Sequence, residues 1–307
     1  MLISRPTVAQ LRAFLAVSEH LHFREAASAL RMSQPALSGA VAALEDALGT
    51  QLLERTTRKV LLTPAGERVA RRAAAVMAEL DRLEEEAAAE RGPLSGPLRF
   101  GVIPTVAPYL LPTVLPDLRR EFPLMELAVR EEQTAHCVAE LIGGRIDVAV
   151  LALPVTTQGL VELPLYEEDF LLAAPSGYEV DEPLARDALG DFEMLLLNEG
   201  HCLRDQALEV CREAGARAAA ATYATSLTTL VQLVAGGLGV TLLPESAVPA
   251  EGGREGMSVR RFRDPAPHRS IGLVHRSTSP RAPEFELLAK VVREAVRGRG
   301  WSVRIAA

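Results

Sequence analysis

The chain has 307 residues, 48% of them hydrophobic, and a mean hydropathy of +0.12, which suits two or three globular domains with apolar cores. No apolar run approaches the roughly 20 residues that a membrane-spanning helix needs, and the first residues lack the pattern of a signal peptide. Three cysteines are too few for a secreted disulfide scaffold, so we expect a cytoplasmic protein.

The net charge of −7 is unevenly distributed along the chain. Residues 1–62 hold seven basic and five acidic side chains, a net charge of +2, which leaves −9 for the remainder. A small basic module on an acidic body is typical of DNA-binding proteins, although a difference of this size also arises by chance.

The first 50 residues predict three helices. Thr7 and Gln10 have the spacing of a capping box at the start of the first helix, and a short second helix is expected over 24–30. Ser33 is the expected N-cap of the third helix, whose apolar residues recur every three or four positions until Gly49 ends it. The second and third helices, joined by a tight turn, indicate a helix-turn-helix.

The segments 52–55 and 59–63 fit the two strands of a wing behind this motif. The third helix would then read base edges and the wing would contact phosphates. The candidate DNA-binding residues are Ser33, Gln34, Pro35 and Ser38 on the helix, and Arg58 and Lys59 on the wing. The alternative is a plain helical bundle in which the third helix is merely capped.

A long helix is expected to begin at Thr63 and Pro64, a cap followed by a proline in the first turn. From Pro64 to Ala89 it would extend about 39 Å. Its apolar residues follow a heptad pattern: Val69, Ala73, Val76, Leu80, Leu83 and Ala87. We therefore expect residues 64–91 to form a dimerisation linker, the alternative being a helix that packs on its own domain. The glycine- and proline-rich residues 92–97 predict a hinge.

Strand-like and helix-like segments alternate beyond the hinge, which predicts βαβ units and a mainly parallel sheet. The chain is expected to cross into a second lobe at 165–174 and to return to the first lobe near residue 270. Residues 98–165 and 269–307 would then form one lobe, and residues 166–268 the second. Small ligands commonly bind in the cleft between two such lobes.

Two cysteines nine positions apart, Cys202 and Cys211, are the main candidates for chemistry. His201 and Arg204 flank the first one, and nearby positive charge favours the reactive thiolate. A second thiol can trap an oxidised first thiol, so the segment predicts a redox sensor. The alternatives are that His201 is a loop histidine whose hydrogen bonds are satisfied, that Cys211 is an ordinary core residue, and that Arg204 and Asp205 form a solvent-exposed face.

The helical pattern after Cys202 adds a geometric constraint. Nine helical residues extend roughly 13 Å and turn the two thiols to opposite sides, whereas a disulfide needs Cα atoms within about 7 Å. The bond therefore requires this helix to unwind. A zinc site is disfavoured because an adjacent His-Cys pair with one distant Cys is not a standard ligand spacing. No nucleotide-binding glycine loop or serine-histidine-carboxylate pattern indicates an enzyme.

Several motifs resemble a known family. The N-terminal ones resemble LysR-type transcriptional regulators: 23–30, Ser33-Gln34-Pro35-Ala36-Leu37-Ser38, 44–49 and 53–56. Others resemble the peroxide-sensing OxyR branch: Gly200-His201-Cys202-Leu203-Arg204-Asp205-Gln206 with Cys211, Ile103-Pro104-Thr105-Val106, 108–112 and 269–274. The resemblance covers nearly the whole chain.

The resemblance implies an α/β fold with an all-α winged helix-turn-helix head (1–63), a linker helix (64–91) and a two-lobed, periplasmic-binding-protein-like regulatory domain (98–307). It implies that hydrogen peroxide oxidises Cys202 and that Cys211 resolves it to a disulfide, with Cys137 outside the pair. The peroxide pocket would comprise Thr105, Thr134, His201 and Arg269, supported by Asp205.

The resemblance also implies promoter DNA, RNA polymerase and a thiol reductant protein as partners, and a homotetramer. We expect no cofactor, no bound metal and no enzymatic turnover. A LysR-type regulator that answers a metabolite in the inter-lobe cleft is the alternative.

Overall fold

The computed structural model describes residues 5–55, 60–88, 92–178 and 182–306. Two compact units make up the chain. The first unit contains residues 1–90 with 143–145, and the second contains the remainder.

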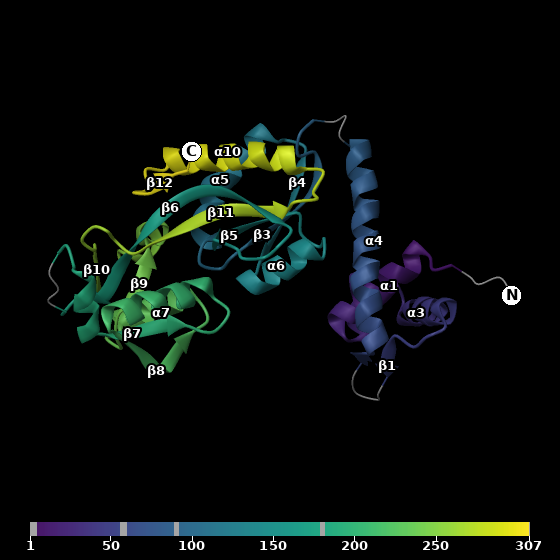
Figure 1. Ribbon diagram of the computed structural model, residues 1–307, viewed down its shortest axis with the longest axis horizontal. Coiled ribbons are helices and arrows are strands. Elements are labelled where there is room, and N and C mark those ends of the chain that lie inside the picture. The colour runs from purple at the N-terminus through teal and green to yellow at the C-terminus, as the bar shows by residue number, and fades with distance from the viewer. Residues whose placement is uncertain (1–4, 56–59, 89–91, 179–181, 307) are drawn as a thin grey trace. The chain divides into compact units, whose positions relative to one another are not determined.

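The first unit is built mainly from helices (Figure 1). Its elements are α1 (Val8–His20), α2 (Phe23–Ala29), α3 (Gln34–Leu48), β1 (Leu53–Arg55), β2 (Val60–Leu62) and α4 (Pro64–Ala88). The capping box of α1 is confirmed, because Thr7 Oγ1 accepts from the Gln10 amide and Gln10 Oε1 accepts from the Thr7 amide. Ser33 caps α3, and Gly49 ends it at φ 64°.

The wing is an antiparallel hairpin in which Leu53 pairs with Leu62. Sequence reasoning did not identify what attaches it to the head. Glu45 on α3 accepts hydrogen bonds from the backbone amides of Leu52 and Leu53 at 2.8 and 3.1 Å. The Glu45 carboxylate therefore ties the start of the wing to α3, in addition to the packing of Leu53 in the core of the head.

The long helix α4 has 25 residues and extends about 38 Å. Its first turns pack on the core of the helical head through Val69 and Ala70, and Ala73 is buried. Further along, Val76 and Leu83 are 46% and 67% exposed. The beginning of the seam therefore packs on the chain's own head, whereas Val76 and Leu83 lie exposed, and dimerisation along the helix stays a prediction.

The second unit alternates strands and helices as expected. In chain order they are β3 (Gly96–Val102), α5 (Ala107–Glu121), β4 (Met125–Glu131), α6 (Thr134–Ile142), β5 (Val148–Leu153), β6 (Leu160–Pro175), η2 (Arg186–Asp191), β7 (Glu193–Leu197), α7 (Cys202–Ala214), β8 (Arg217–Ala224), α8 (Leu227–Ala235), β9 (Thr241–Pro244), η3 (Glu245–Ala247), α9 (Val248–Glu251), β10 (Met257–Arg260), β11 (His268–Arg276), α10 (Ala282–Gly298) and β12 (Arg304–Ile305).

The expectation of a mainly parallel sheet is wrong. The main sheet runs β10-β6-β11-β5-β3-β4, with β9 and β12 also paired to β6. Among the described residues, the β3–β4 and β3–β5 pairs are parallel, and the other pairs in this sheet are antiparallel. The long strands β6 and β11 run antiparallel and belong to both halves of the unit. Alternation of elements along the sequence could not reveal this, because it does not encode the direction in which a crossing strand returns.

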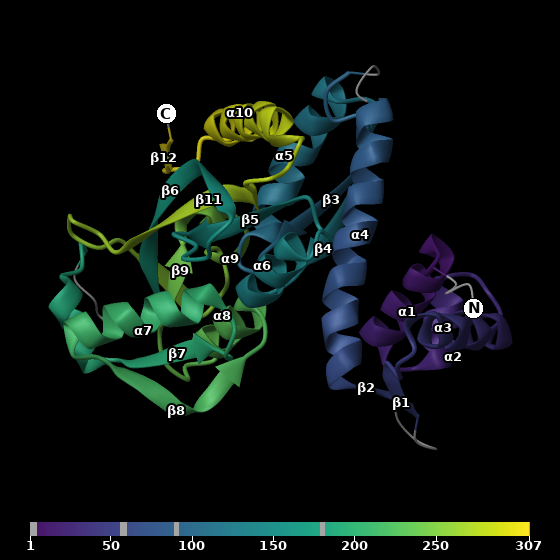
Figure 2. The ribbon, with the colours of Figure 1, turned by 45° about the vertical axis from the view of Figure 1, so that its right-hand side comes forward.

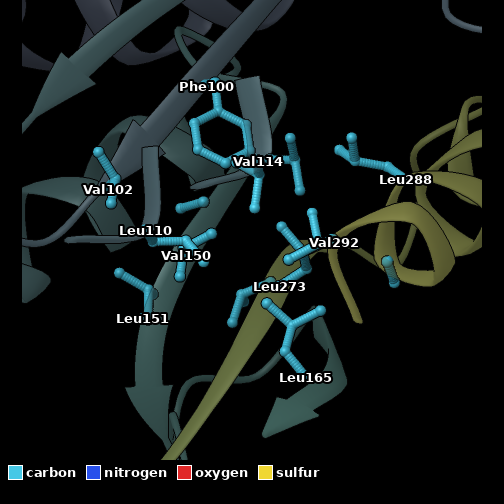
Figure 3. Close-up of a cluster of buried hydrophobic side chains, with 14 of the residues drawn as sticks. Phe100, Val102, Leu110, Val114, Val150, Leu151, Leu165, Leu273, Leu288 and Val292 are labelled. Carbon is cyan, nitrogen blue, oxygen red and sulfur yellow. The ribbon is translucent and has the colours of Figure 1, made fainter. Parts of the chain in front are cut away.

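Two apolar cores lie in this unit. One is formed between the sheet and helices α5 and α10, where side chains from both layers converge (Figure 3). The other surrounds β7, β9, α7 and α8. Helices α5 and α10 lie side by side over the sheet (Figure 2), and α7 packs on β7 and β8. Within the described residues, no helix is long and apolar enough to cross a membrane.

Candidate functional site

The candidate site begins at the N-terminus of α7, where Cys202 is the first helical residue. Gly200 lies two residues before it and has φ 91°, a conformation that favours glycine, and a Cβ there would displace the end of the Gln133 side chain. Cys202 is half-buried and packs against the core under α5 and α10. The positive end of the helix dipole lies beside this thiol, an arrangement that favours negative charge.

His201 caps α7 by position and is 6% exposed, but its side chain makes no capping hydrogen bond. Burial lowers its pKa, which favours the neutral imidazole near pH 7. Arg204 points elsewhere: it donates to the Leu197 carbonyl at 3.1 Å and lies over the Tyr223 ring. His201 and Arg204, the neighbours of Cys202 in the sequence, are therefore not the main source of positive charge at its thiol.

That charge comes from Arg269 on β11, whose side chain is fully buried. The guanidinium donates to Thr105 Oγ1 at 3.0 Å and to the Thr105 carbonyl at 3.2 Å. Burial acts to lower the pKa of Arg269, yet the pKa is raised overall because Glu168 and Cys202 interact with its charge. The structure thus joins Arg269 to Thr105 through hydrogen bonds, and the charge of Arg269 acts on Cys202 from a third segment of the chain.

Glu168 is the residue that sequence reasoning missed. Its side chain is fully buried on β6 and accepts from Arg269 Nε at 2.8 Å. Its second oxygen accepts from the Ser246 amide, also at 2.8 Å. An acidic run inside an otherwise apolar strand, Glu167-Glu168-Asp169, was the available signal, because a carboxylate is buried only when it has a charged partner.

Thr134 lies at the start of α6, next to the loop that precedes Cys202. Its neighbour Gln133 donates to the Glu199 carbonyl at 3.2 Å. Among the described side chains, Thr134 Oγ1 and Asn198 Oδ1 are buried polar atoms without a hydrogen-bond partner. Two such atoms flanking one loop are available to a small polar molecule.

The two candidate thiols lie in different cores. Cys202 packs on the first-lobe core, whereas Cys211 is 3% exposed inside the second-lobe core, where burial raises its pKa. Both are free. Cys137 is also free and 1% exposed, and burial raises its pKa to about 12. It lies in the first-lobe core on α6.

The remaining site predictions receive less support from position. Asp205 is exposed on the first turn of α7. Ser33, Gln34 and Pro35 are exposed at the start of α3, although the Ser33 hydroxyl already accepts from the Ala36 amide. Ser38 is half-buried one turn later. Arg58 and Lys59 lie outside the described residues.

A cavity of about 350 Å³ opens beside α7 and the crossing strands, with Gln206, Glu209 and Arg269 among its lining residues. Cys202 does not line it, so this cavity is not the pocket of the thiol. No cluster of three or more potential metal ligands occurs in the part of the chain that the structure describes.

Comparison with known proteins covers both units. Residues 8–67 match the family described as bacterial regulatory helix-turn-helix protein, lysR family, and residues 91–297 match the LysR substrate binding domain. A probable hydrogen peroxide-inducible genes activator of Streptomyces viridosporus is 59% identical, over 95% of each chain. The DNA-binding transcriptional dual regulator OxyR of Escherichia coli K12 is 44% identical, over 95% of this chain and 96% of that one.

Among solved structures, an H2O2-bound mutant of Corynebacterium glutamicum OxyR superposes with a TM-score of 0.67. It is 44% identical, and the match covers 96% of this chain and 94% of that one.

Proposed function

Because this chain belongs to the LysR family of bacterial helix-turn-helix transcriptional regulators, in its OxyR branch, we propose that it activates antioxidant genes in response to hydrogen peroxide. One observation carries this proposal: a half-buried cysteine stands at a helix N-terminus, and a fully buried arginine, whose charge acts on that cysteine, is hydrogen-bonded to Thr105. The relatives named for hydrogen peroxide support the choice of oxidant.

The first chemical step is oxidation of Cys202. Its thiolate attacks one oxygen of the peroxide, a sulfur–oxygen bond forms, and the oxygen–oxygen bond breaks. Sulfur loses two electrons to the departing oxygen, which takes up a proton and leaves as water. Arg269 and the Thr105 hydroxyl are the groups we assign to stabilise the negative charge on that oxygen. Thr134 and the neutral His201 complete the proposed pocket as hydrogen-bonding groups.

The second step joins Cys202 to Cys211. The Cys211 sulfur attacks the sulfenic acid, a disulfide forms, and water leaves. Along α7 the two residues are separated by roughly 13 Å, and their side chains belong to different cores. Disulfide closure therefore needs α7 to unwind and Cys211 to leave its core, which gives oxidation a structural consequence.

The head transmits this change to DNA. We assign the start of α3, with Ser33, Gln34, Pro35 and Ser38, to contacts with base edges, and Arg58 and Lys59 to contacts with DNA phosphates. The remodelled lobe would shift subunit contacts, so an oligomer is part of the proposal.

Open apolar surface on the first unit supports a dimer. Val76 and Leu83 lie exposed on α4, and a cavity of about 640 Å³ is lined largely by apolar residues that include Leu11, Leu48 and Val69. Tetramer formation, RNA polymerase contact and a reducing partner protein remain parts of the proposal that the family implies. Residues 92–97 are the proposed hinge and residues 98–307 the redox-sensing domain, with the two lobes as assigned from the sequence.

Substitution of each cysteine tests the proposal. Cys202→Ser should abolish peroxide-dependent transcription, and Cys211→Ser should prevent the intramolecular disulfide while leaving Cys202 oxidisable. Cys137→Ser is the matched control, because this buried thiol has a raised pKa and should not react.

A normal peroxide response from Cys202→Ser would refute the assigned sensor. If peroxide has no effect on the wild-type chain but a metabolite binds in calorimetry, the protein answers a cleft ligand instead.

A further inference from the structure

The fully buried pair of Glu168 and Arg269 connects the two crossing strands. Glu168 on β6 and Arg269 on β11 are directly opposite each other in the antiparallel register. Neither side chain is accessible to solvent, and the nearest nitrogen–oxygen distances are 2.8 Å. A buried guanidinium without a carboxylate partner carries a large desolvation cost, so Arg269 depends on Glu168 for its place.

The carboxylate has two donors to satisfy, one on each side. One oxygen accepts from Arg269, and the other accepts from the Ser246 amide in the second lobe. Glutamine has the same shape but offers one acceptor and one donor group. In a glutamine at this position, the side-chain NH2 group would therefore face another hydrogen-bond donor, either the Arg269 guanidinium or the Ser246 amide.

The guanidinium held in this way has its remaining contacts at the thiol site. Its Nη1 and Nη2 atoms donate to Thr105, which lies in the first lobe, and its charge interacts with Cys202. Phe170 lies beneath it, with the ring centroid 5.9 Å from Cζ. Rotation of the guanidinium would release Thr105 and move the charge away from the thiol.

We propose that Glu168 is a positioning residue for the peroxide reaction, which holds the Arg269 guanidinium and Thr105 where the departing oxygen of the peroxide develops negative charge. This inference rests on the proposed function. The sulfur of Cys202 is oxidised and the oxygen–oxygen bond is reduced and broken, with the departing hydroxide protonated to water. Glu168 exchanges no proton or electron in this step.

Competition between two reagents for the same thiol provides the test. Full-length protein is mixed with hydrogen peroxide and iodoacetamide together, and mass spectrometry of the Cys202 peptide gives the ratio of oxidation to alkylation. The same thiolate attacks both reagents, so its abundance cancels from the ratio. What remains is stabilisation specific to peroxide, which a merely structural residue would not change.

Glu168→Gln should lower this ratio at least about tenfold, because removing preorganised donors from a developing oxyanion typically has that effect or a larger one. Glu167→Gln is the matched control: Glu167 is adjacent on the same strand, also pairs with an arginine, and is 47% exposed. Its ratio should equal that of the wild type. Adding Glu168→Gln to Arg269→Gln should lower the ratio no further, because Glu168 acts through Arg269.

A folded Glu168→Gln variant with the wild-type ratio would overturn the inference, as would an equal loss in Glu167→Gln or an additive loss in the double variant. If circular dichroism shows Glu168→Gln unfolded, Glu168→Asp decides by the same criterion, because it keeps the charge and shortens the reach. If the wild-type ratio is no higher than that of a free thiol such as N-acetylcysteine, the proposed function itself fails.

Discussion

The end of α7 offers a way to change disulfide closure without touching either thiol. Gly215 ends this helix at φ 69°, and its amide donates to the carbonyl of Cys211. A Cβ at this position would meet no atom within 4 Å, so Gly215→Ala adds backbone strain and no steric clash. A residue with a side chain in this left-handed conformation costs about 1 kcal/mol.

That strain is present while α7 is helical and is relieved when the helix unwinds. If unwinding precedes closure, the barrier to the disulfide falls by up to about 1 kcal/mol, which corresponds to an increase of about fivefold in the closure rate. Formation of the sulfenic acid should keep its wild-type rate, because Cys202 lies at the other end of the helix. Acid quenching followed by mass spectrometry measures the amounts of the Cys202 sulfenic acid and of the disulfide against time.

Gly237→Ala is the matched control. Gly237 follows α8 in the same lobe and has φ 83°, and a methyl group added there would likewise meet no atom within 4 Å. Both variants should melt about 2–4 °C lower than the wild type. Only Gly215→Ala should close its disulfide faster. Equal closure rates in the wild type and in Gly215→Ala, despite the lower melting temperature, would refute unwinding as the barrier.

Three further outcomes are expected. Burial lowers the pKa of His201, so the unfolded chain binds the proton more readily, and stability is lost as the pH falls below about 6.5. His201→Gln should therefore reduce the fall in melting temperature between pH 7.5 and 5.5. A fall as large as that of the wild type would contradict this. Tyr109→Phe removes a 3.2 Å hydrogen bond to the buried Glu251 and should lower the free energy of unfolding by about 1 kcal/mol in urea titrations, since Glu251 keeps other partners; no loss would show that the bond contributes nothing. Gln34→Ala should weaken binding to a preferred operator by about 1–3 kcal/mol in anisotropy titrations but leave non-specific binding intact, and equal losses on both DNAs would indicate a phosphate contact.

Local patterns predicted the elements well because their causes are local. The capping box at Thr7, the N-cap at Ser33 and the proline after Thr63 each act within one turn of helix, and all three helices begin there. The helix after Cys202 was likewise predictable, and with it the separation of the thiols. The neighbours of Cys202 in the sequence did not, however, predict the source of positive charge at its thiol. Burial favours neutral His201, and Arg204 points to Leu197.

The long-range parts of the site could not be derived from spacing. Arg269 reaches Thr105 across 164 positions, and only the antiparallel return of β11 beside β6 brings Glu168 to it. The resemblance to a family supplied Arg269 and Thr105, whereas Glu168 required the register of the strands. The direction of the crossing strands was predicted wrongly for the same reason, because antiparallel pairing between segments a hundred residues apart leaves no periodic mark in either one.

Hydrogen exchange along α7, measured before and after one equivalent of hydrogen peroxide, tests the proposed switch most directly. We predict that the amides of 203–214 lose protection together with the appearance of a Cys202–Cys211 disulfide, and that Cys202→Ser shows neither change. A disulfide between these residues in a protein whose α7 amides remain fully protected would contradict the account.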